Sequence, residues 1–138
     1  MSRRTDQRRA AVFALYQAEV TSRELEDVFE RNASPFTRSL AHAAQDRGEE
    51  LDAHIASHAK GWALDRIAPL ERAIMRVALL EMLHPDAAPA DFPIPPEGAI
   101  DEAVELAKTY SGADAPKFVN GILAAVHREM GDNQAQTT

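Results

Sequence analysis

The 138-residue chain contains no cysteine, which excludes disulfides, thiolate nucleophiles and cysteine-ligated metal sites. Its apolar runs are far shorter than the roughly 20 residues of a membrane-spanning helix. No signal-peptide pattern is present, so we expect a cytoplasmic protein with no membrane partner. Neither a Gly-rich phosphate loop nor a Ser-His-Asp arrangement can be found. These absences indicate no enzyme and no cofactor, and they favour a binding protein.

Two histidines, His54 and His58, stand four residues apart, a spacing that can bind zinc from one helix face. The residues between them lack the glutamate of a metalloprotease helix, and no third ligand is indicated. We therefore expect two exposed histidines and no metal.

Charge is distributed unevenly along the chain. The net charge is −7, but residues 1–9 carry a balance of +3 and the remainder −10. An acidic body repels nucleic acid at long range and suits a basic protein partner. An arginine cluster can still bind phosphates locally, because salt screens the field beyond about 8 Å. The residues alone leave open whether this arm of residues 1–9 binds RNA or is a disordered, solvated terminus.

Helical spacing of apolar residues recurs throughout, without a credible alternating strand. We expect a single all-α domain over residues 1–138, with about seven helices in two small packed lobes that divide near Lys60–Pro69. Five prolines make residues 84–98 a loop, and the polar tail over 131–138 is expected to be disordered. The predicted helices cover residues 7–20, a short segment to 32, 35–59 as one helix or two broken at Gly48, 70–83, 100–108 and about 115–130.

The last helical pattern contains two residues outside its apolar stripe. Asp114 can cap this helix, and Pro116 is tolerated in its first turn. Phe118 lies about 90° from the stripe, counting 3.6 residues per turn. Gly121 lies almost opposite, where a glycine costs roughly 1 kcal/mol relative to alanine, so we expect another backbone to approach it. From the residues alone, we favour the interpretation that Phe118 belongs to the periphery of the core and that Gly121 makes a helix–helix contact.

Three stretches of the chain resemble the NusB family of bacterial transcription antitermination factors. The most specific is KFVNGIL, about a dozen residues after EAVELAK, within AIDEAVELAKTYSGADAPKFVNGIL. RRTDQRRAAVFALYQAEV at the start and APLERAIMRVALLEM in the middle agree in order and spacing. The resemblance covers Arg3 to Met130, although the loop over 84–98 looks longer than is usual in the family.

The resemblance implies a NusB-like fold and an RNA-binding antitermination factor. Such a factor binds the boxA element of nascent RNA, pairs with the small-subunit ribosomal protein NusE, and joins the RNA polymerase antitermination complex on ribosomal RNA operons. The resemblance also implies that Glu71 helps to hold NusE. From the residues alone, Glu71 is explained as an acid in the first turn of a helix, where the helix dipole stabilises it. The RNA-binding residues that we expect are Arg3, Arg4, Arg8, Arg9, Tyr16, Asp114, Lys117, Phe118 and Asn120.

Two alternatives stay open. NusB-like domains also occur fused to RNA cytosine methyltransferases, but this chain leaves no room for a cofactor-binding domain, so it would act as a helper of a separate enzyme. The second alternative is a self-associating helical protein without an RNA role, because some family members form homodimers that cover the RNA surface.

Overall fold

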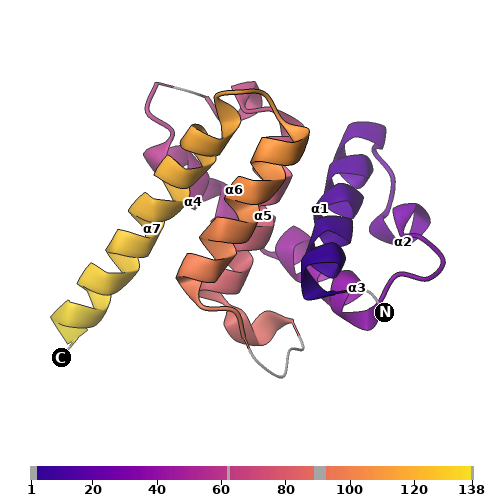
Figure 1. Cartoon of the computed structure of the whole chain (residues 1–138), viewed down its shortest axis with the longest axis horizontal. Coiled ribbons are helices and arrows are strands. Elements are labelled where there is room, and N and C mark those ends of the chain that lie inside the picture. The colour runs from indigo at the N-terminus through magenta and orange to yellow at the C-terminus, as the bar shows by residue number, and fades with distance from the viewer. Residues whose placement is uncertain (1–2, 62, 89–92, 138) are drawn as a thin grey trace.

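The computed structural model describes residues 3–61, 63–88 and 93–137, with side chains up to Asp132. In these ranges the chain forms seven α-helices and no strand (Figure 1), which confirms the predicted all-α class. None of the described helices has the length and apolar content to cross a membrane. The helices are α1 (Arg4–Thr21), α2 (Leu25–Val28), α3 (Pro35–Asp46), α4 (Gly48–His58), α5 (Pro69–Leu83), α6 (Pro96–Tyr110) and α7 (Ala115–Thr137), with short 3-10 turns at Leu64–Arg66 and Pro85–Ala87.

The central element of the fold is α5. Its apolar residues occur on more than one side, as is typical of a helix that is covered from several directions. It packs against α1, α3, α4, α6 and α7. One continuous apolar core joins these helices. The residues of α5 that are buried are Ala73, Ile74, Met75, Val77, Ala78, Leu79, Leu80 and Met82.

The two helical groups divide earlier in the chain than the sequence indicates. α4 packs against α5 and α7 and touches α3 only slightly, so it belongs to the C-terminal group. Arg47 separates α3 from α4, which begins at Gly48, where a break was one of the two expected possibilities. The segment Lys60–Pro69, whose Trp62 lies outside the described residues, is therefore a connection within the C-terminal group.

Both ends of the chain are more helical than expected. α1 begins at Arg4, with Asp6 in its first turn, where the helix dipole favours an acid. Most of the expected arm is therefore part of a helix. α7 continues to Thr137, through residues for which we expected a disordered tail. No proline interrupts this segment, and glutamine and alanine are good helix formers.

The proline-rich loop is shorter than expected at its C-terminal end. α6 begins at Pro96 rather than Ile100, because proline is well suited to the first position of a helix. Pro85 likewise begins a 3-10 turn. Residues 89–92 of this loop, including Pro89, lie outside the described residues.

Two further expectations are wrong. A Cβ added to the exposed Gly121 would meet no atom within 4 Å, so no other backbone of the described chain approaches it closely. The side chain of His58 is only 19% exposed, and its Nε2 lies 2.7 Å from a carboxylate oxygen of Glu129 on α7. His58 therefore lies between α4 and α7, in contrast to the exposed histidine that we expected.

Candidate nucleic-acid interface

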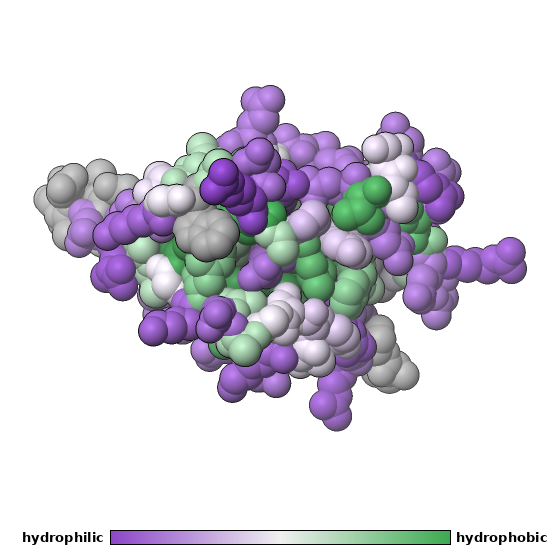
Figure 2. Space-filling model, turned by 90° about the horizontal axis from the view of Figure 1, so that it is seen from above, coloured by the Kyte–Doolittle hydropathy of each residue, from purple (hydrophilic) through white to green (hydrophobic). Residues whose placement is uncertain are grey.

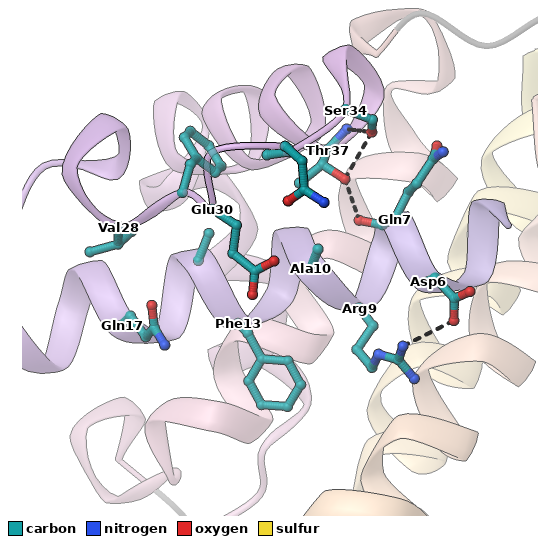
Figure 3. A pocket seen from close by; sticks show the side chains of 14 residues that line it. Asp6, Gln7, Arg9, Ala10, Phe13, Gln17, Val28, Glu30, Ser34 and Thr37 are labelled. Carbon is teal, nitrogen blue, oxygen red and sulfur yellow. Dashed lines mark hydrogen bonds and ion pairs between the residues drawn. The ribbon is translucent and has the colours of Figure 1, made fainter. Parts of the chain in front are cut away.

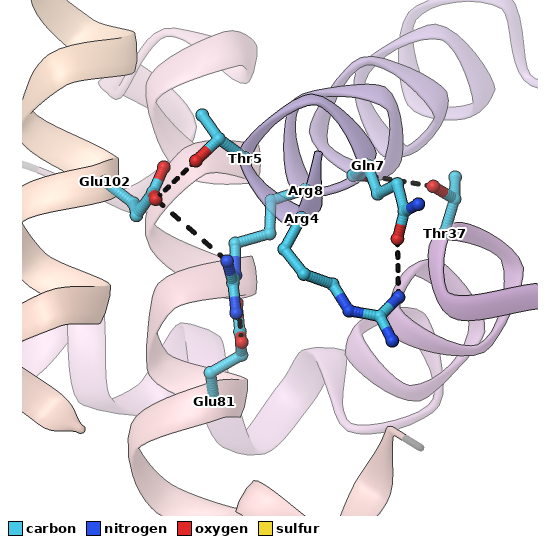
Figure 4. Close-up of polar contacts among 7 residues, drawn as sticks. All are labelled: Arg4, Thr5, Gln7, Arg8, Thr37, Glu81 and Glu102. Carbon is cyan, nitrogen blue, oxygen red and sulfur yellow. Dashed lines mark hydrogen bonds and ion pairs between the residues drawn. The ribbon is translucent and has the colours of Figure 1, made fainter. Parts of the chain in front are cut away.

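Arg8 lies inside the fold and makes contacts that join three helices (Figure 4). The residue is 8% exposed, and its Nε donates to both carboxylate oxygens of Glu81 on α5, at 2.8 and 3.1 Å. A terminal nitrogen of the same guanidinium lies 4.0 Å from Glu102 on α6, and the Thr5 hydroxyl donates to that carboxylate at 2.8 Å. Arg8 was expected to bind RNA, but its position makes it a residue that holds α1 against α5 and α6.

The carboxylate opposite Arg8 has an unusual environment. Burial raises the pKa of Glu81, the hydrogen bond and charge of Arg8 oppose this rise, and the charge of Glu102 adds to it. A buried ion pair of this kind is costly to break, because the remaining charge loses its partner inside the protein.

The other arginines near the start of α1 remain at the surface. Arg3 is the exposed residue before the helix. Arg4 is also exposed, and its guanidinium carbon lies 4.3 Å from the centroid of the Phe36 ring. Arg9 lies 3.0 Å from Asp6, with 41% of its side chain exposed. These three arginines can contact phosphates without any rearrangement of the helices.

Replacing Arg3 and Arg4 together by alanine should weaken binding to all RNAs similarly. Each phosphate contact contributes about 0.7 to the slope of log affinity against log salt for single strands. We therefore expect the slope to become shallower by about 1.4 in titrations at several salt concentrations. Arg38→Ala, in α3, provides the matched control. An unchanged slope would show that Arg3 and Arg4 do not contact the RNA.

The first turn of α7 carries the second set of expected RNA-binding residues. The N–H of Phe118 donates to the carbonyl of Asp114 at 3.2 Å, which places Asp114 immediately before the helix. Lys117 and Asn120 are exposed, whereas Phe118 is half-buried and packs against the core. The unpaired N–H groups and positive dipole of a helix N-terminus favour phosphate.

A hollow of about 220 Å³ joins this turn to the start of α5. Its lining includes Glu71 of α5 together with Asp114 and Phe118, so the expected partner-binding residue adjoins the expected RNA-binding residues. Burial raises the pKa of Glu71. Within the described part of the chain, no hydrogen bond or ion pair holds its carboxylate. Glu71 is therefore available to a cationic group of a partner.

The structure does not gather all the expected RNA-binding residues at one point. Arg3 and Arg4 stand at the N-terminal end of α1, low in Figure 1, whereas the first turn of α7 lies at the upper edge of that view. Tyr16 is half-buried against the core and lies about 18 Å along α1 from Arg4, at 1.5 Å per residue. One RNA strand would have to extend along α1 to contact both sets.

Two aromatic residues that the sequence analysis did not assign to a site join α1 to α6. The rings of Phe13 and Tyr110 meet edge to face, with centroids 5.0 Å apart and planes at 90°. Thr5 and Arg8 of α1 also contact Glu102 of α6. Phe13 follows Thr5 by eight residues on α1, and Tyr110 follows Glu102 by eight residues on α6. The two helices therefore run in parallel (Figure 1).

A larger pocket of about 400 Å³ lies between α1 and the segment from α2 to the start of α3 (Figure 3). At the edge of the pocket, Arg9 and Phe13 point to the same side of α1. Glu30 reaches the pocket from the segment that faces α1. The hydroxyl of Thr37 donates to the backbone of α1 at 2.8 Å and closes one end. Its mixed charge, from the Arg9–Asp6 pair and Glu30, does not favour a polyanion.

Comparison with known sequences shows the family to which this chain belongs. The profile of the NusB family matches residues 5–128. The chain belongs to the NusB family. The resemblance that KFVNGIL and its neighbouring motifs indicated is thereby confirmed.

Curated relatives in the NusB family match over most of the chain. The transcription antitermination protein NusB of Symbiobacterium thermophilum is 42% identical over 118 residues, which cover 82% of this chain and 73% of that protein. The protein of the same name from Halalkalibacterium halodurans is 39% identical over 130 residues, covering 90% and 92%.

Solved NusB structures have the same fold. NusB of T. maritima superposes with a TM-score of 0.77 at 30% identity, covering 93% of this chain and 92% of that one. A crystal structure of the antitermination factors NusB and NusE with double-stranded RNA gives a TM-score of 0.73, covering 91% and 96%. The identity there is 24%, so that likeness is one of fold.

Proposed function

We propose that this chain is a transcription antitermination factor that binds the boxA element of nascent RNA together with NusE. It would thereby support processive transcription of ribosomal RNA operons in the cytoplasm, as a binding protein without catalytic activity. The observation that carries this proposal is the 42% identity with a curated antitermination protein over 82% of the chain.

The surface of the molecule offers the two kinds of contact that single-stranded RNA uses. Arg3, Arg4 and Lys117 are exposed cations for phosphates. Phe118 is a half-buried aromatic residue beside a helix N-terminus, and single-stranded RNA exposes bases that stack on aromatic rings. These features support RNA binding although the net charge of the chain is −7.

The proposed protein partner is NusE, and Glu71 is its proposed contact. The acidic body suits a basic ribosomal protein. Glu71 lies half-buried in the hollow beside Asp114 and Phe118. A NusB chain of the same fold has been crystallised with NusE and RNA. A partner held at Glu71 would therefore lie next to the RNA bound at the first turn of α7.

Replacing Glu71 by lysine should weaken NusE binding without changing the fold. A hydrogen bond to a charged group contributes roughly 1.5–3 kcal/mol, so we expect at least a tenfold rise in the dissociation constant by calorimetry. Glu71→Gln keeps the shape and isolates the charge, and Glu49→Lys on α4 is the matched control. Unchanged affinity of Glu71→Lys would remove this residue from the interface.

Transcription through a terminator tests the function itself. On a template that encodes boxA upstream of a terminator, adding this chain together with NusE to the antitermination complex should increase read-through. The same addition should have little effect when boxA is scrambled. Equal read-through on the two templates would contradict the proposed function.

A further inference from the structure

Tyr110, the last residue of α6, is unusually exposed for a large hydrophobic residue. Its exposed fraction is 44%, and Val20, at 48%, is the other large hydrophobic residue that is open to solvent within the described structure. Val20 lies in the last turn of α1, and Tyr110 ends α6. The face seen from above in Figure 2 carries a band of hydrophobic side chains between hydrophilic margins. An aromatic ring held in such a place has a surface on which another flat group can stack.

The Tyr110 ring is held in place by a neighbour from another helix. Phe13 of α1 meets it at 5.0 Å with the ring planes at 90°, and Phe13 is itself partly buried. An edge-to-face pair at this distance is favourable beyond its buried area. Tyrosine has only two side-chain torsions to fix, so little conformational entropy remains to be lost when a ligand binds.

The position of Tyr110 links the two sets of expected RNA contacts. The turn after Tyr110 leads within four residues to Asp114 and the first turn of α7. Its partner Phe13 lies on α1 between Arg9 and Tyr16. A strand that extends from α7 to α1 would therefore pass over this aromatic pair.

The chemistry at this end of α6 favours a base over a phosphate. The last carbonyls of a helix and the negative end of its dipole repel an anion. The ring of Tyr110 carries no charge and accepts the face of any base. Phosphates fit better at the N-terminus of α7, where Lys117 is exposed.

We propose that Tyr110 is a base-stacking residue of the RNA interface and that Phe13 positions its ring. This inference rests on the proposed function. Single-stranded RNA extends from the first turn of α7 over Tyr110 to α1, with one base stacked on the Tyr110 ring.

Titration of a labelled single-stranded boxA-type RNA by fluorescence anisotropy tests this proposal. Tyr110→Ala should lower the affinity about 5- to 150-fold, the range for loss of one base–aromatic stack. Tyr110→Phe keeps the ring and should bind like the original chain, and Val20→Ala is the matched control. The slope of log affinity against log salt should stay unchanged in Tyr110→Ala, because no phosphate contact is lost. Phe13→Leu should weaken binding less than Tyr110→Ala.

A direct readout of stacking separates this role from a structural one. 2-Aminopurine placed at successive RNA positions should lose fluorescence at one position on binding, and Tyr110→Ala should abolish that change. Normal RNA affinity of Tyr110→Ala would overturn the proposal. If Tyr110→Ala instead shifts a monomer–dimer equilibrium in sedimentation with RNA affinity unchanged, the face binds a second copy and the proposal is also overturned. Failure of the original chain to bind RNA at all would contradict the proposed function.

Discussion

Replacing Arg8 by alanine should lower the free energy of unfolding by roughly 3–5 kcal/mol, the usual cost of removing one partner of a buried ion pair. Arg8 and Glu81 have side-chain exposures of 9% and 11%, so the glutamate would be left charged inside the protein. Denaturant unfolding followed by circular dichroism measures this loss.

The matched control for Arg8 is its neighbour in sequence. Arg9→Ala removes an exposed ion pair with Asp6 and should cost no more than about 1 kcal/mol. Arg8→Met with Glu81→Leu removes both buried charges and should be more stable than Arg8→Ala alone. If Arg8→Ala is as stable as Arg9→Ala, Arg8 is not the residue that holds α1 in place.

The stability of the Arg8→Ala variant should also depend on pH. Burial raises the pKa of Glu81, so the folded chain holds this proton more tightly than the unfolded chain. Stability from this group is therefore greatest below the ordinary pKa of glutamate and is lost as the pH rises through the raised value. Arg8 opposes the rise in the pKa of Glu81, so removing Arg8 should raise this pKa further. The pH range in which the group contributes stability should then extend to higher pH. The loss caused by Arg8→Ala should consequently be smaller in acid than at neutral pH.

Phe118→Ala should lower RNA affinity by about 1–3 kcal/mol, or roughly 5- to 150-fold, because one base loses its stacking surface. A fully buried phenylalanine costs roughly 3–5 kcal/mol of stability when cut to alanine. Phe118 is only half-buried, so we expect a smaller loss of stability. Anisotropy titrations and thermal unfolding of the same variant separate the two effects.

Val119→Ala is the control for Phe118→Ala, since Val119 is fully buried on the same helix. It should lower stability and leave RNA affinity at low temperature unchanged. NusE affinity is measured in parallel because Phe118 lines the hollow that contains Glu71. A large loss of stability with normal RNA affinity would show that Phe118 belongs to the core and that the RNA surface lies elsewhere.

The helices and the central place of α5 could be predicted from local patterns. Apolar residues on several sides of α5 indicate burial from several directions, and α5 contacts five other helices. The possible break at Gly48 and the helix start at Pro69 follow from the residues at those positions.

The role of Arg8 was missed although the sequence contains a signal for it. Ala11, Leu15 and Ala18 form the buried stripe of α1, and helical spacing extends that stripe back to Arg8. Glu81 is likewise the one acid in the apolar C-terminal part of α5, from Val77 to Leu83, and the two residues together indicate a buried pair. Residue type groups Arg8 with the neighbouring arginines, whereas its position on α1 places it in the core.

The Phe13–Tyr110 pair could not be predicted from local sequence. Its formation requires α1 and α6 to run in parallel on α5, and this arrangement results from packing between residues almost 100 positions apart. The exposure of Tyr110 likewise depends on how the turn after α6 leads into α7.

The central claim is that this chain recognises boxA-type RNA through the surface between α7 and α1. Its most direct test is an anisotropy titration of labelled boxA RNA at physiological salt, compared with a scrambled RNA of equal length, with and without NusE. The account predicts tighter binding to boxA than to the scrambled RNA, and tighter binding still when NusE is present. Equal, weak binding to both RNAs that disappears as salt is raised would contradict it.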